Sequence, residues 1–439
     1  MKEKVIHGIV LISQIAYGIY IFLFPVSYFH DDALRFSRGI EHFSVLEQSP
    51  HFPGYPGLIV LGKGVNLFLQ SPDYALFYVG GLGSILIPFF IYLWLFLSTR
   101  NLTIALAGYF YALFQPLLVF LSVSMLSDGI TMAFVLMAML SLRNKHYGIT
   151  GFLSGLFFMI RPSYGIMALG LALYVYLKER NKFYSFIISF LWVFSGFFLL
   201  MLGLEGFGYL TEAQRFITGH FLVWGKTAFS SSSFLASWLN TFSEIFGSAY
   251  GAIIIGLIFL VFLINTRKFY ISNPVVWLVS GYSLWILFAQ NPESPRHAAP
   301  VLFLGILIIF YGIASMRHHW IRVFLSAGLV CHALFTFLSL PLVPESPPIH
   351  KVANELEDTS EVIVVTSYGI ETLRQRLPQA AILDAYYSAS VSRWIQEKSH
   401  KKIFKLSQIP CSDDRYRLVA RFPKRFIGEH TLYLYKRIS

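Results

Sequence analysis

Residues 73–97 read DYALFYVGGLGSILIPFFIYLWLFL, a stretch in which Asp73 is the only charged residue. A helix needs about 20 mostly apolar residues to cross the hydrocarbon core of a bilayer, so this stretch predicts a membrane-spanning helix. Gly80, Gly81 and Gly83 interrupt its large side chains. They indicate a face on which a neighbouring helix packs closely.

Comparable apolar runs recur along the chain, at 5–27, 103–121, 124–141, 183–203, 247–264, 275–290, 298–315 and 321–342. We therefore expect nine full spans and a mainly α fold, that of a polytopic helical membrane protein. The composition agrees, because 56% of the 439 residues are hydrophobic and 13% are charged, whereas a soluble protein carries about 25% charged residues. This composition excludes a soluble enzyme, a nucleic-acid-binding domain and a disordered tail protein.

The charged residues gather toward the C-terminus. Residues 1–343 contain 19 basic and 12 acidic residues, and residues 344–439 contain 15 and 11. We predict a multi-spanning membrane domain over 1–343 and a small soluble α/β domain over 344–439, with no disulfide between Cys331 and Cys411. In the second domain we expect strands at 361–366, 381–384, 416–421 and 431–436 and helices at 370–376 and 388–398. The linker is marked by Pro341, Pro344, Pro347 and Pro348.

The positions of lysine and arginine predict the orientation, because cytoplasmic loops are rich in these residues. One set of connections holds 12 of them and the opposite set holds 6. We therefore place the N-terminus in the cytoplasm and the C-terminal domain outside the plasma membrane, together with the loops at 28–72, 204–246 and 291–297. The short apolar segment Gly57–Gln70 contains Lys63 and is expected to lie at the outer interface.

The apolar segment 148–177 is interrupted by Arg161 and Pro162 and has basic residues on both sides. Two half-helices that re-enter from the cytoplasm fit this pattern, provided that other helices shelter the turn. Two short, tilted spans are the alternative. The re-entrant interpretation places Arg161 too far inward for an outer site and favours a structural partner for it, since a buried arginine is costly.

Polar residues suited to catalysis or binding concentrate on the predicted outer side. His30, Asp31 and Asp32 follow the first span, and a carboxylate there can act as a general base on a hydroxyl group. The alternative is that the acids only mark a helix end. The stiff segment 49–56 contains three prolines and can place His51 and Tyr55 at the rim of a cavity, although an ordinary loop is equally compatible with it.

Other outer residues are candidates for binding an anion. Asp128 opens a predicted helix and either caps it or belongs to a site. Arg296 and His297 lie in a tight loop before a span, where the guanidinium group can bind a phosphate or simply extend to the interface. Further candidates for an anionic headgroup are Lys63, Arg215 and Lys226.

The sequence contains no GxxxxGK[ST] loop, no strand–GxGxxG–helix unit, no HExxH and no CxxC. An enzyme whose polar groups face outward also has no access to cytoplasmic nucleotides. It needs an activated substrate that arrives in the membrane, and a sugar linked to polyprenyl phosphate meets that requirement.

The ordered motifs resemble those of the GT-C glycosyltransferases, such as dolichyl-phosphate-mannose–protein mannosyltransferases and lipid A aminoarabinose transferases. The resemblance rests on Asp31-Asp32 after the first span, His51–Pro56, Leu126–Asp128, Gly155–Pro162 and Arg296–Pro300. Two features depart from the family pattern, since His297 stands where tyrosine is commonest and the C-terminal domain is small.

The resemblance implies transfer of a glycosyl group, with inversion, from a polyprenyl-phosphate donor to an acceptor hydroxyl. Asp31, ahead of Asp32, would deprotonate the acceptor, and Arg296 would stabilise the leaving phosphate with help from Lys226 or Lys63. The acceptor can be a glycan, a glycolipid or a protein. No cofactor is expected, although His30, Asp31, Asp32 and His51 offer ligands for a divalent cation. A transporter or flippase is the main alternative, and a scaffold without catalytic activity is a third.

Overall fold

The computed structural model describes residues 2–28, 30–225, 227–229, 234–265, 273–339, 344–359, 361–385, 402–425 and 427–438. The chain divides into two compact units. The membrane unit consists of Met1–Leu23 and Phe36–Leu340, and the C-terminal unit consists of Phe24–Arg35 and Pro341–Ser439. The short segment after the first helix therefore belongs with the end of the chain, which the sequence did not indicate.

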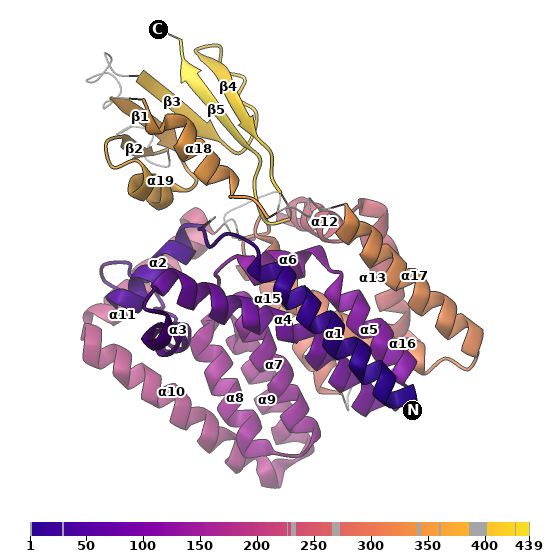
Figure 1. Ribbon diagram of the computed structural model, residues 1–439. Coiled ribbons are helices and arrows are strands. Elements are labelled where there is room, and N and C mark those ends of the chain that lie inside the picture. The colour runs from indigo at the N-terminus through magenta and orange to yellow at the C-terminus, as the bar shows by residue number, and fades with distance from the viewer. Residues whose placement is uncertain are drawn as a thin grey trace. The chain divides into compact units, whose positions relative to one another are not determined.

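The membrane unit is built of helices (Figure 1). They are α1 (Lys2–Phe22), α2 (Asp31–Glu41, begun in the C-terminal unit), α3 (Pro56–Leu69), α4 (Pro72–Thr99), α5 (Leu102–Leu113), α6 (Pro116–Val123), α7 (Asp128–Arg143), α8 (Tyr147–Ile160), α9 (Gly165–Lys178), α10 (Phe183–Glu205), α11 (Gly208–Gly219), α12 (Phe234–Ile245), α13 (Ala249–Asn265), α15 (Pro274–Ala289), α16 (Ala299–Ala314) and α17 (His319–Leu338). The predicted fold class, a mainly α polytopic membrane protein with a small C-terminal α/β part, is confirmed.

The expectation of nine full spans is wrong in detail. Among the described residues, five helices are long and apolar enough to cross a membrane, or up to seven if each bent pair is one span. The predicted span 103–121 is divided into α5 and α6, which meet at 59°, because Pro116 has no N–H to continue the helix and starts a new one. The predicted span 247–264 corresponds to α13, which meets α12 at 94°.

Close helix packing at the glycine cluster is confirmed. A Cβ atom added to Gly83 in α4 would lie 2.4 Å from the Ile130 Cα atom of α7, so only a hydrogen fits between the two backbones. One added to Gly151 in α8 would lie 2.0 Å from the Phe186 carbonyl oxygen of α10. These contacts fix α7 and α8 between their neighbours.

The chain breaks between α8 and α9, at Arg161, as predicted. However, Arg161 contacts Asp128, the first residue of α7, and α8 runs beside α7 (Figure 1). Since α8 has 14 residues and is about 21 Å long, it extends along most of α7. The break therefore lies level with the start of α7, and the re-entrant interpretation, which placed Arg161 too deep, is replaced by two short helices that flank the break.

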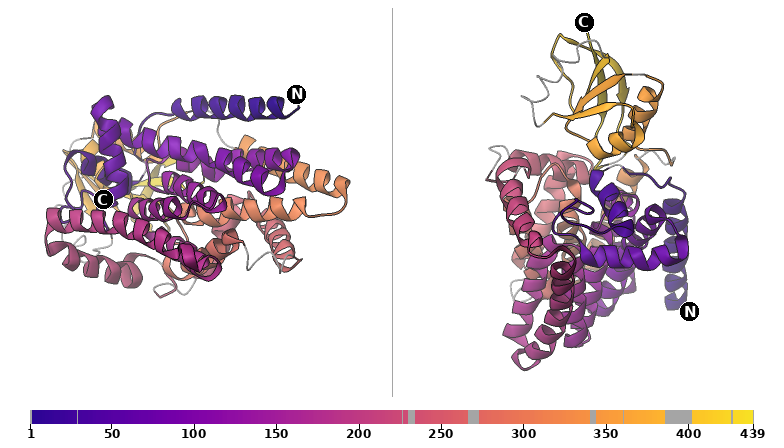
Figure 2. Two further views of the ribbon diagram at one scale, coloured as in Figure 1. Left: turned by 90° about the horizontal axis from the view of Figure 1, so that it is seen from below. Right: turned by 90° about the vertical axis from the view of Figure 1, so that its left-hand side faces the viewer.

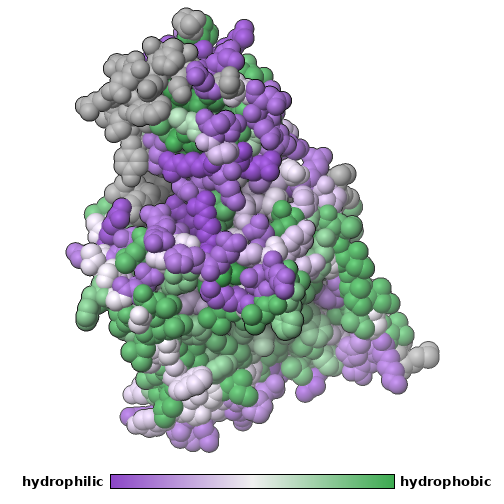
Figure 3. Space-filling view, turned by 60° about the vertical axis from the view of Figure 1, so that its left-hand side comes forward, coloured by the Kyte–Doolittle hydropathy of each residue, from purple (hydrophilic) through white to green (hydrophobic). Residues whose placement is uncertain are grey.

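Hydrophobic side chains cover a broad belt on the surface of the membrane unit, and hydrophilic side chains border it (Figure 3). Exposed residues such as Leu67, Ile188, Trp192 and Phe324 are at least 65% accessible. Large apolar side chains at this exposure are expected where lipid replaces water as the surrounding solvent. The surface is therefore that of a multi-pass membrane protein.

The C-terminal unit contains a five-stranded sheet in the order β2-β1-β3-β5-β4. The strands are β1 (Val362–Thr366), β2 (Ala381–Asp384), β3 (Lys402–Ser407), β4 (Tyr416–Phe422) and β5 (Leu432–Arg437). The strands β2, β1 and β3 are parallel, and β5 pairs antiparallel with β3 and β4. Two helices, α18 (Pro348–Glu357) and α19 (Ile370–Arg376), pack on one face (Figures 1 and 2).

Most of the predicted elements of this unit are confirmed, but two were missed. Of the prolines that were assigned to a linker, Pro348 begins α18, since proline fits the first turn of a helix. The strand β3 was not predicted. The predicted helix 388–398 lies outside the described residues.

Candidate active site

A buried ion pair lies at the centre of the polar residues of the membrane unit. The Arg161 Nη1 atom lies 3.1 Å from the Asp128 Oδ2 atom and donates a hydrogen bond of 2.9 Å to the Ser127 hydroxyl. Asp128 is fully buried and Arg161 is 5% exposed. A buried charge needs such a partner because desolvation is costly, so Asp128 does more than open α7.

Two tyrosines enclose this ion pair. The Arg161 guanidinium carbon lies 5.8 Å from the centre of the Tyr164 ring, and the Tyr164 and Tyr282 rings pack edge to face, 5.4 Å apart. Both tyrosine hydroxyls, the Asp128 Oδ1 atom and the Arg161 Nε atom are buried without a hydrogen-bond partner among the described residues. Buried polar atoms are normally hydrogen-bonded, so several of them together indicate a place where a polar ligand binds.

Arg296 and His297 lie in the loop before α16. Together with Asp128, Arg161, Tyr164 and Tyr282 they form what we call the polar cluster. Both are buried, and Arg296 lies close enough to Tyr164 and Tyr282 to interact with them electrostatically. His297 interacts in the same way with Arg296 and Arg161, and its Nδ1 atom is 3.0 Å from the Asn291 carbonyl oxygen. The predicted residues Asp128, Arg296 and His297 therefore come together around Arg161.

His51 and Tyr55 reach the cluster through contacts between aromatic rings, which are edge to face between the two of them. The centres of the His51 and Tyr55 rings are 5.2 Å apart, and Tyr55 interacts electrostatically with Arg161. On its other side, His51 stacks on Phe216 at 5.7 Å, and Phe216 stacks on His220 at 6.2 Å. The predicted pair thus contacts the cluster, next to α11.

The loop that carries His51 is fastened to the end of α10. The Glu205 carboxylate accepts a hydrogen bond of 2.9 Å from the Val45 amide, and Val45 packs in a small apolar cluster with Met201 and Tyr209. The Tyr209 hydroxyl also donates to the Pro53 carbonyl oxygen, at 3.2 Å. These contacts hold an irregular segment in one conformation, as a site requires.

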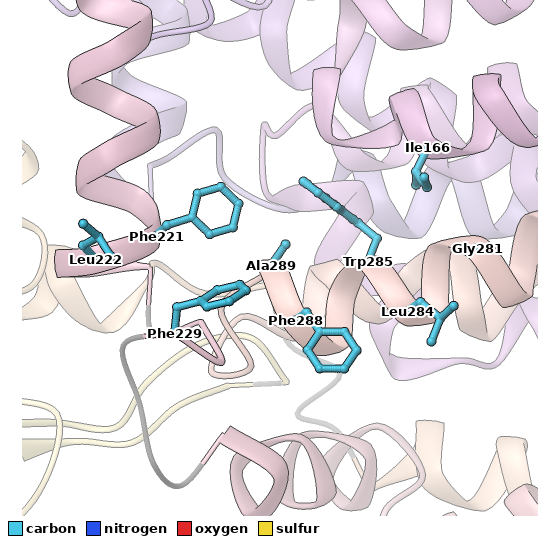
Figure 4. A pocket seen from close by; sticks show the side chains of 9 residues that line it. All are labelled: Ile166, Phe221, Leu222, Phe229, Gly281, Leu284, Trp285, Phe288 and Ala289. Carbon is cyan, nitrogen blue, oxygen red and sulfur yellow. The ribbon is translucent and has the colours of Figure 1, made fainter.

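An apolar pocket of about 710 Å³ lies against α15 (Figure 4). Phe221 and Phe229 line one side, and Trp285, Phe288 and Ala289 of α15 line the other. A second pocket, of about 400 Å³, shares two lining residues with the first, Ile166 and Gly281, and continues between α9 and α15. The two pockets form one apolar groove.

Two contacts connect this groove to the polar cluster. The His220 Nε2 atom lies 2.8 Å from the carbonyl oxygen of Ala289, which lines the groove, and His220 interacts electrostatically with His297. Gly281 in the groove wall precedes Tyr282 in the cluster. An amphiphile with an apolar tail and a polar headgroup fits this arrangement.

The remaining predicted residues lie elsewhere. The Lys63 ammonium group donates a hydrogen bond of 2.7 Å to the Ile40 carbonyl oxygen, near the end of α2. Lys226 lies outside the described residues. The Asp31 carboxylate accepts hydrogen bonds from Glu371 and Thr372 inside the C-terminal unit.

Asp32, the second acid of the pair, is half-buried. Its Oδ2 atom lies 3.3 Å from the Nδ1 atom of His30. Within the part of the chain that the structure describes, no group of three or more His, Cys, Asp or Glu side chains is arranged to hold a metal ion.

Sequence reasoning missed Tyr164, Tyr282 and His220. The two tyrosines lie in apolar stretches where an aromatic residue most often serves packing, and His220 lies within the predicted outer loop 204–246, where no motif marks it. Only the position of Tyr164, three residues after Arg161, was a signal.

Neither a protein-family model nor a curated protein matches this sequence. Several solved structures are similar in fold, among them two of ArnT. ArnT from Cupriavidus metallidurans in the apo state gives a TM-score of 0.55 at 12% identity, over 98% of both chains. ArnT from the same organism bound to undecaprenyl phosphate gives 0.50 at 10% identity, over 98% of this chain and 97% of that one. The structural resemblance to GT-C glycosyltransferases is thus confirmed for the fold.

Proposed function

We propose that this protein transfers a glycosyl group from a polyprenyl-phosphate-linked donor to an acceptor hydroxyl at the outer face of the plasma membrane. The observation that carries the proposal is an apolar groove that ends beside a buried cluster of two arginines, one carboxylate and two tyrosines. A polyprenyl phosphate has an apolar isoprenoid tail and an anionic headgroup, so a single molecule fits both the apolar groove and the cluster with its two arginines. The similar fold of an ArnT structure bound to undecaprenyl phosphate supports this class of lipid.

Arg296 is the proposed ligand of the donor phosphate. Arg296 brings a second guanidinium group into the cluster that contains the Asp128–Arg161 pair. Guanidinium groups bind phosphate oxygens through paired, charge-assisted hydrogen bonds. The tail would lie along α9 and α15. Of the two lysines expected to assist Arg296, Lys63 bonds the Ile40 carbonyl oxygen instead, so Lys226 alone is proposed for this role.

The proposed reaction is a single displacement. A carboxylate of the Asp31–Asp32 pair takes the proton of the acceptor hydroxyl while its oxygen attacks the anomeric carbon. The bond from this carbon to the phosphate oxygen breaks, and the configuration inverts. Arg296 stabilises the negative charge that develops on the leaving phosphate, an effect worth about 3 kcal/mol for one well-placed donor. The step is proposed without a metal ion, because two adjacent acids do not readily direct both carboxylates at one ion.

Binding of undecaprenyl phosphate to the purified full-length protein tests the donor site. We expect Arg296→Gln to weaken binding about tenfold or more, since a hydrogen bond to a charged group is worth about 1.5–3 kcal/mol. Arg415→Gln is the matched control, because Arg415 is exposed in the C-terminal unit, where it pairs with Asp413 at 2.7 Å. Equal affinity of the Arg296→Gln variant and the wild type would contradict the assignment.

A transporter also binds a lipid-linked sugar, so the fate of the sugar separates the two functions. With labelled donor in proteoliposomes, the proposed enzyme releases free polyprenyl phosphate and transfers the label to an acceptor. A transporter moves the intact donor across the bilayer and breaks no bond.

A further inference from the structure

The short helix α19 has no cap of its own. Its N-cap residue is Gly369, which has no side chain and adopts φ 64°, a left-handed conformation that glycine tolerates best. A Cβ atom at this position would also lie 2.6 Å from the Ile349 Cδ1 atom. A capping side chain such as that of serine or aspartate is therefore disfavoured at position 369, and the first amides of α19 need an acceptor from elsewhere.

Asp31 provides that acceptor. Its Oδ2 atom accepts a hydrogen bond of 3.2 Å from the Glu371 amide, and its Oδ1 atom accepts bonds of 3.1 and 2.9 Å from the amide and the hydroxyl of Thr372. Thr372 is buried, at 1% exposure. Both oxygens of Asp31 thus serve a helix that lies some 340 residues away in sequence, in the same compact unit.

A second contact fastens the same segment. The His350 Nε2 atom of α18 donates a hydrogen bond of 2.6 Å to the Tyr28 carbonyl oxygen, three residues before Asp31. The side chains of Phe24 and Tyr28 are buried as well. The segment Phe24–Arg35 is therefore held by both helices that pack on the sheet of the C-terminal unit.

We propose that Asp31 is a positioning residue, which fastens the segment carrying the acid pair to α19, and that Asp32 takes the proton of the acceptor. The proposal rests on the proposed glycosyl transfer and assigns different tasks to the two acids. As a base, Asp31 would have only one lone-pair site left, on Oδ2, because its hydrogen bonds to Glu371 and Thr372 use the other three. We call the three hydrogen bonds from Glu371 and Thr372 to Asp31 the clamp. Because Asp32 follows Asp31 directly, the clamp fixes the backbone of Asp32.

Conservative variants separate the two roles. The carboxamide oxygen of Asp31→Asn still accepts the hydrogen bonds from Thr372, although its NH2 group no longer accepts the one from Glu371, and it cannot take a proton. Asp31→Ala removes the whole contact. Thr372→Val removes the hydroxyl donor on the opposite side, and Thr372→Ser, which keeps it, is the matched control. All variants are made in the full-length protein, together with Asp32→Asn.

Two measurements are needed. Hydrogen exchange at the Glu371 and Thr372 amides reports the clamp, and release of undecaprenyl phosphate from a panel of undecaprenyl-phosphate-linked hexoses and pentoses reports turnover. We expect Asp31→Ala to accelerate exchange at both amides and to lower kcat more than Asp31→Asn does. Asp31→Asn should lose less than about tenfold in kcat, and Asp32→Asn about 100-fold or more, which is the scale of a lost general base.

Several results would overturn the proposal. If Asp31→Asn is as inactive as Asp31→Ala while exchange at α19 stays slow, Asp31 is itself the base. If Asp31→Ala leaves the exchange unchanged, the clamp does not exist in solution. If the clamp is present but full turnover survives in Asp31→Ala and in Asp32→Asn, neither acid acts as proposed. Unchanged binding of undecaprenyl phosphate to Arg296→Gln, in contrast, counts against the proposed donor site and leaves the clamp intact.

Discussion

Arg161 is the residue on which the candidate site in the membrane unit depends. It joins Asp128 of α7 to the break between α8 and α9 and lies near Tyr55, Tyr164 and Tyr282. Its pairing with Asp128 balances charge in a place where water has little access. The pair therefore determines how precisely the surrounding polar groups are placed.

Asp128→Asn should destabilise the protein strongly. Removing one partner of a buried ion pair leaves an uncompensated charge, which costs about 3–5 kcal/mol. We expect this loss in the free energy of unfolding, measured by titration with a denaturing detergent in mixed micelles. Glu212→Gln is the control, because its partner Arg215 is exposed and ion pairs at the surface contribute about 0.2–1 kcal/mol. Equal stability of the two variants would show that the Asp128–Arg161 contact is not formed.

For single residues, the sequence predicted which side chains belong to the candidate site better than it predicted which residues they contact. His51, Tyr55, Asp128, Arg296 and His297 were selected as polar residues on one side of the membrane, and they do gather around Arg161. The partner of Asp31 could not be predicted, because the need for a distant cap follows from the left-handed conformation of Gly369.

The helices α4, α7, α8 and α10 place the cluster through close contacts of their backbones. The sequence shows the glycines that permit these contacts, but it does not show which helix packs against each of them. The same holds for the bend at Pro116, since proline can also lie within a helix, as Pro88 does in α4.

Gly83→Ala should therefore lower stability more than alanine does at an open position. Its Cβ atom would lie 2.4 Å from the Ile130 Cα atom, whereas nothing lies within 4 Å of the same atom at Gly196 in α10. We expect Gly83→Ala to lower the Tm in detergent, because overpacking costs about 1–3 kcal/mol. Gly196→Ala should leave the Tm unchanged or raise it slightly. A reversed order would mean that α4 and α7 are not packed this closely.

The contact of α18 with Tyr28 makes the stability of the C-terminal unit depend on pH. Burial lowers the pKa of His350 below its usual value, and its hydrogen bond to the Tyr28 carbonyl oxygen opposes this shift. As the pH falls below about 6.5, the unfolded histidine gains a proton before the folded one does. The stabilising contribution is therefore complete above this pH and is lost progressively below it.

Hydrogen exchange in α18 of the full-length protein at several pH values measures this effect. We expect protection to decrease on acidification in the wild type and to change less in His350→Gln, which keeps a donor but does not titrate. Identical pH profiles would exclude His350 as the group responsible.

For the molecule as a whole, we predict that the C-terminal unit lies outside the cell. A cysteine introduced by Ser412→Cys, at an exposed position of that unit, should react with a membrane-impermeant maleimide in intact cells. One introduced by Asn144→Cys, in the exposed turn between α7 and α8, should react only after the cells are opened. Both variants are made without Cys331 and Cys411, and the reverse pattern would invert the topology.

Whole-molecule features were the easiest to predict. Two-thirds or more of each predicted span lies within one helix, for the spans 73–97, 183–203, 275–290 and 298–315. The reason is that the length of an apolar run can be read directly from the sequence. The joining of Phe24–Arg35 to the C-terminal unit was not predictable, since it depends on contacts between chain segments more than 300 residues apart.

The most direct test of the proposed function follows the labelled sugar of a polyprenyl-phosphate donor in proteoliposomes that contain cell-envelope acceptors. We predict that the wild type releases polyprenyl phosphate and forms a glycosidic bond of inverted configuration. The variant that combines Asp31→Asn with Asp32→Asn should bind the lipid and transfer nothing. Transfer by this variant at the wild-type rate, or passage of the intact donor through the bilayer, would contradict the account.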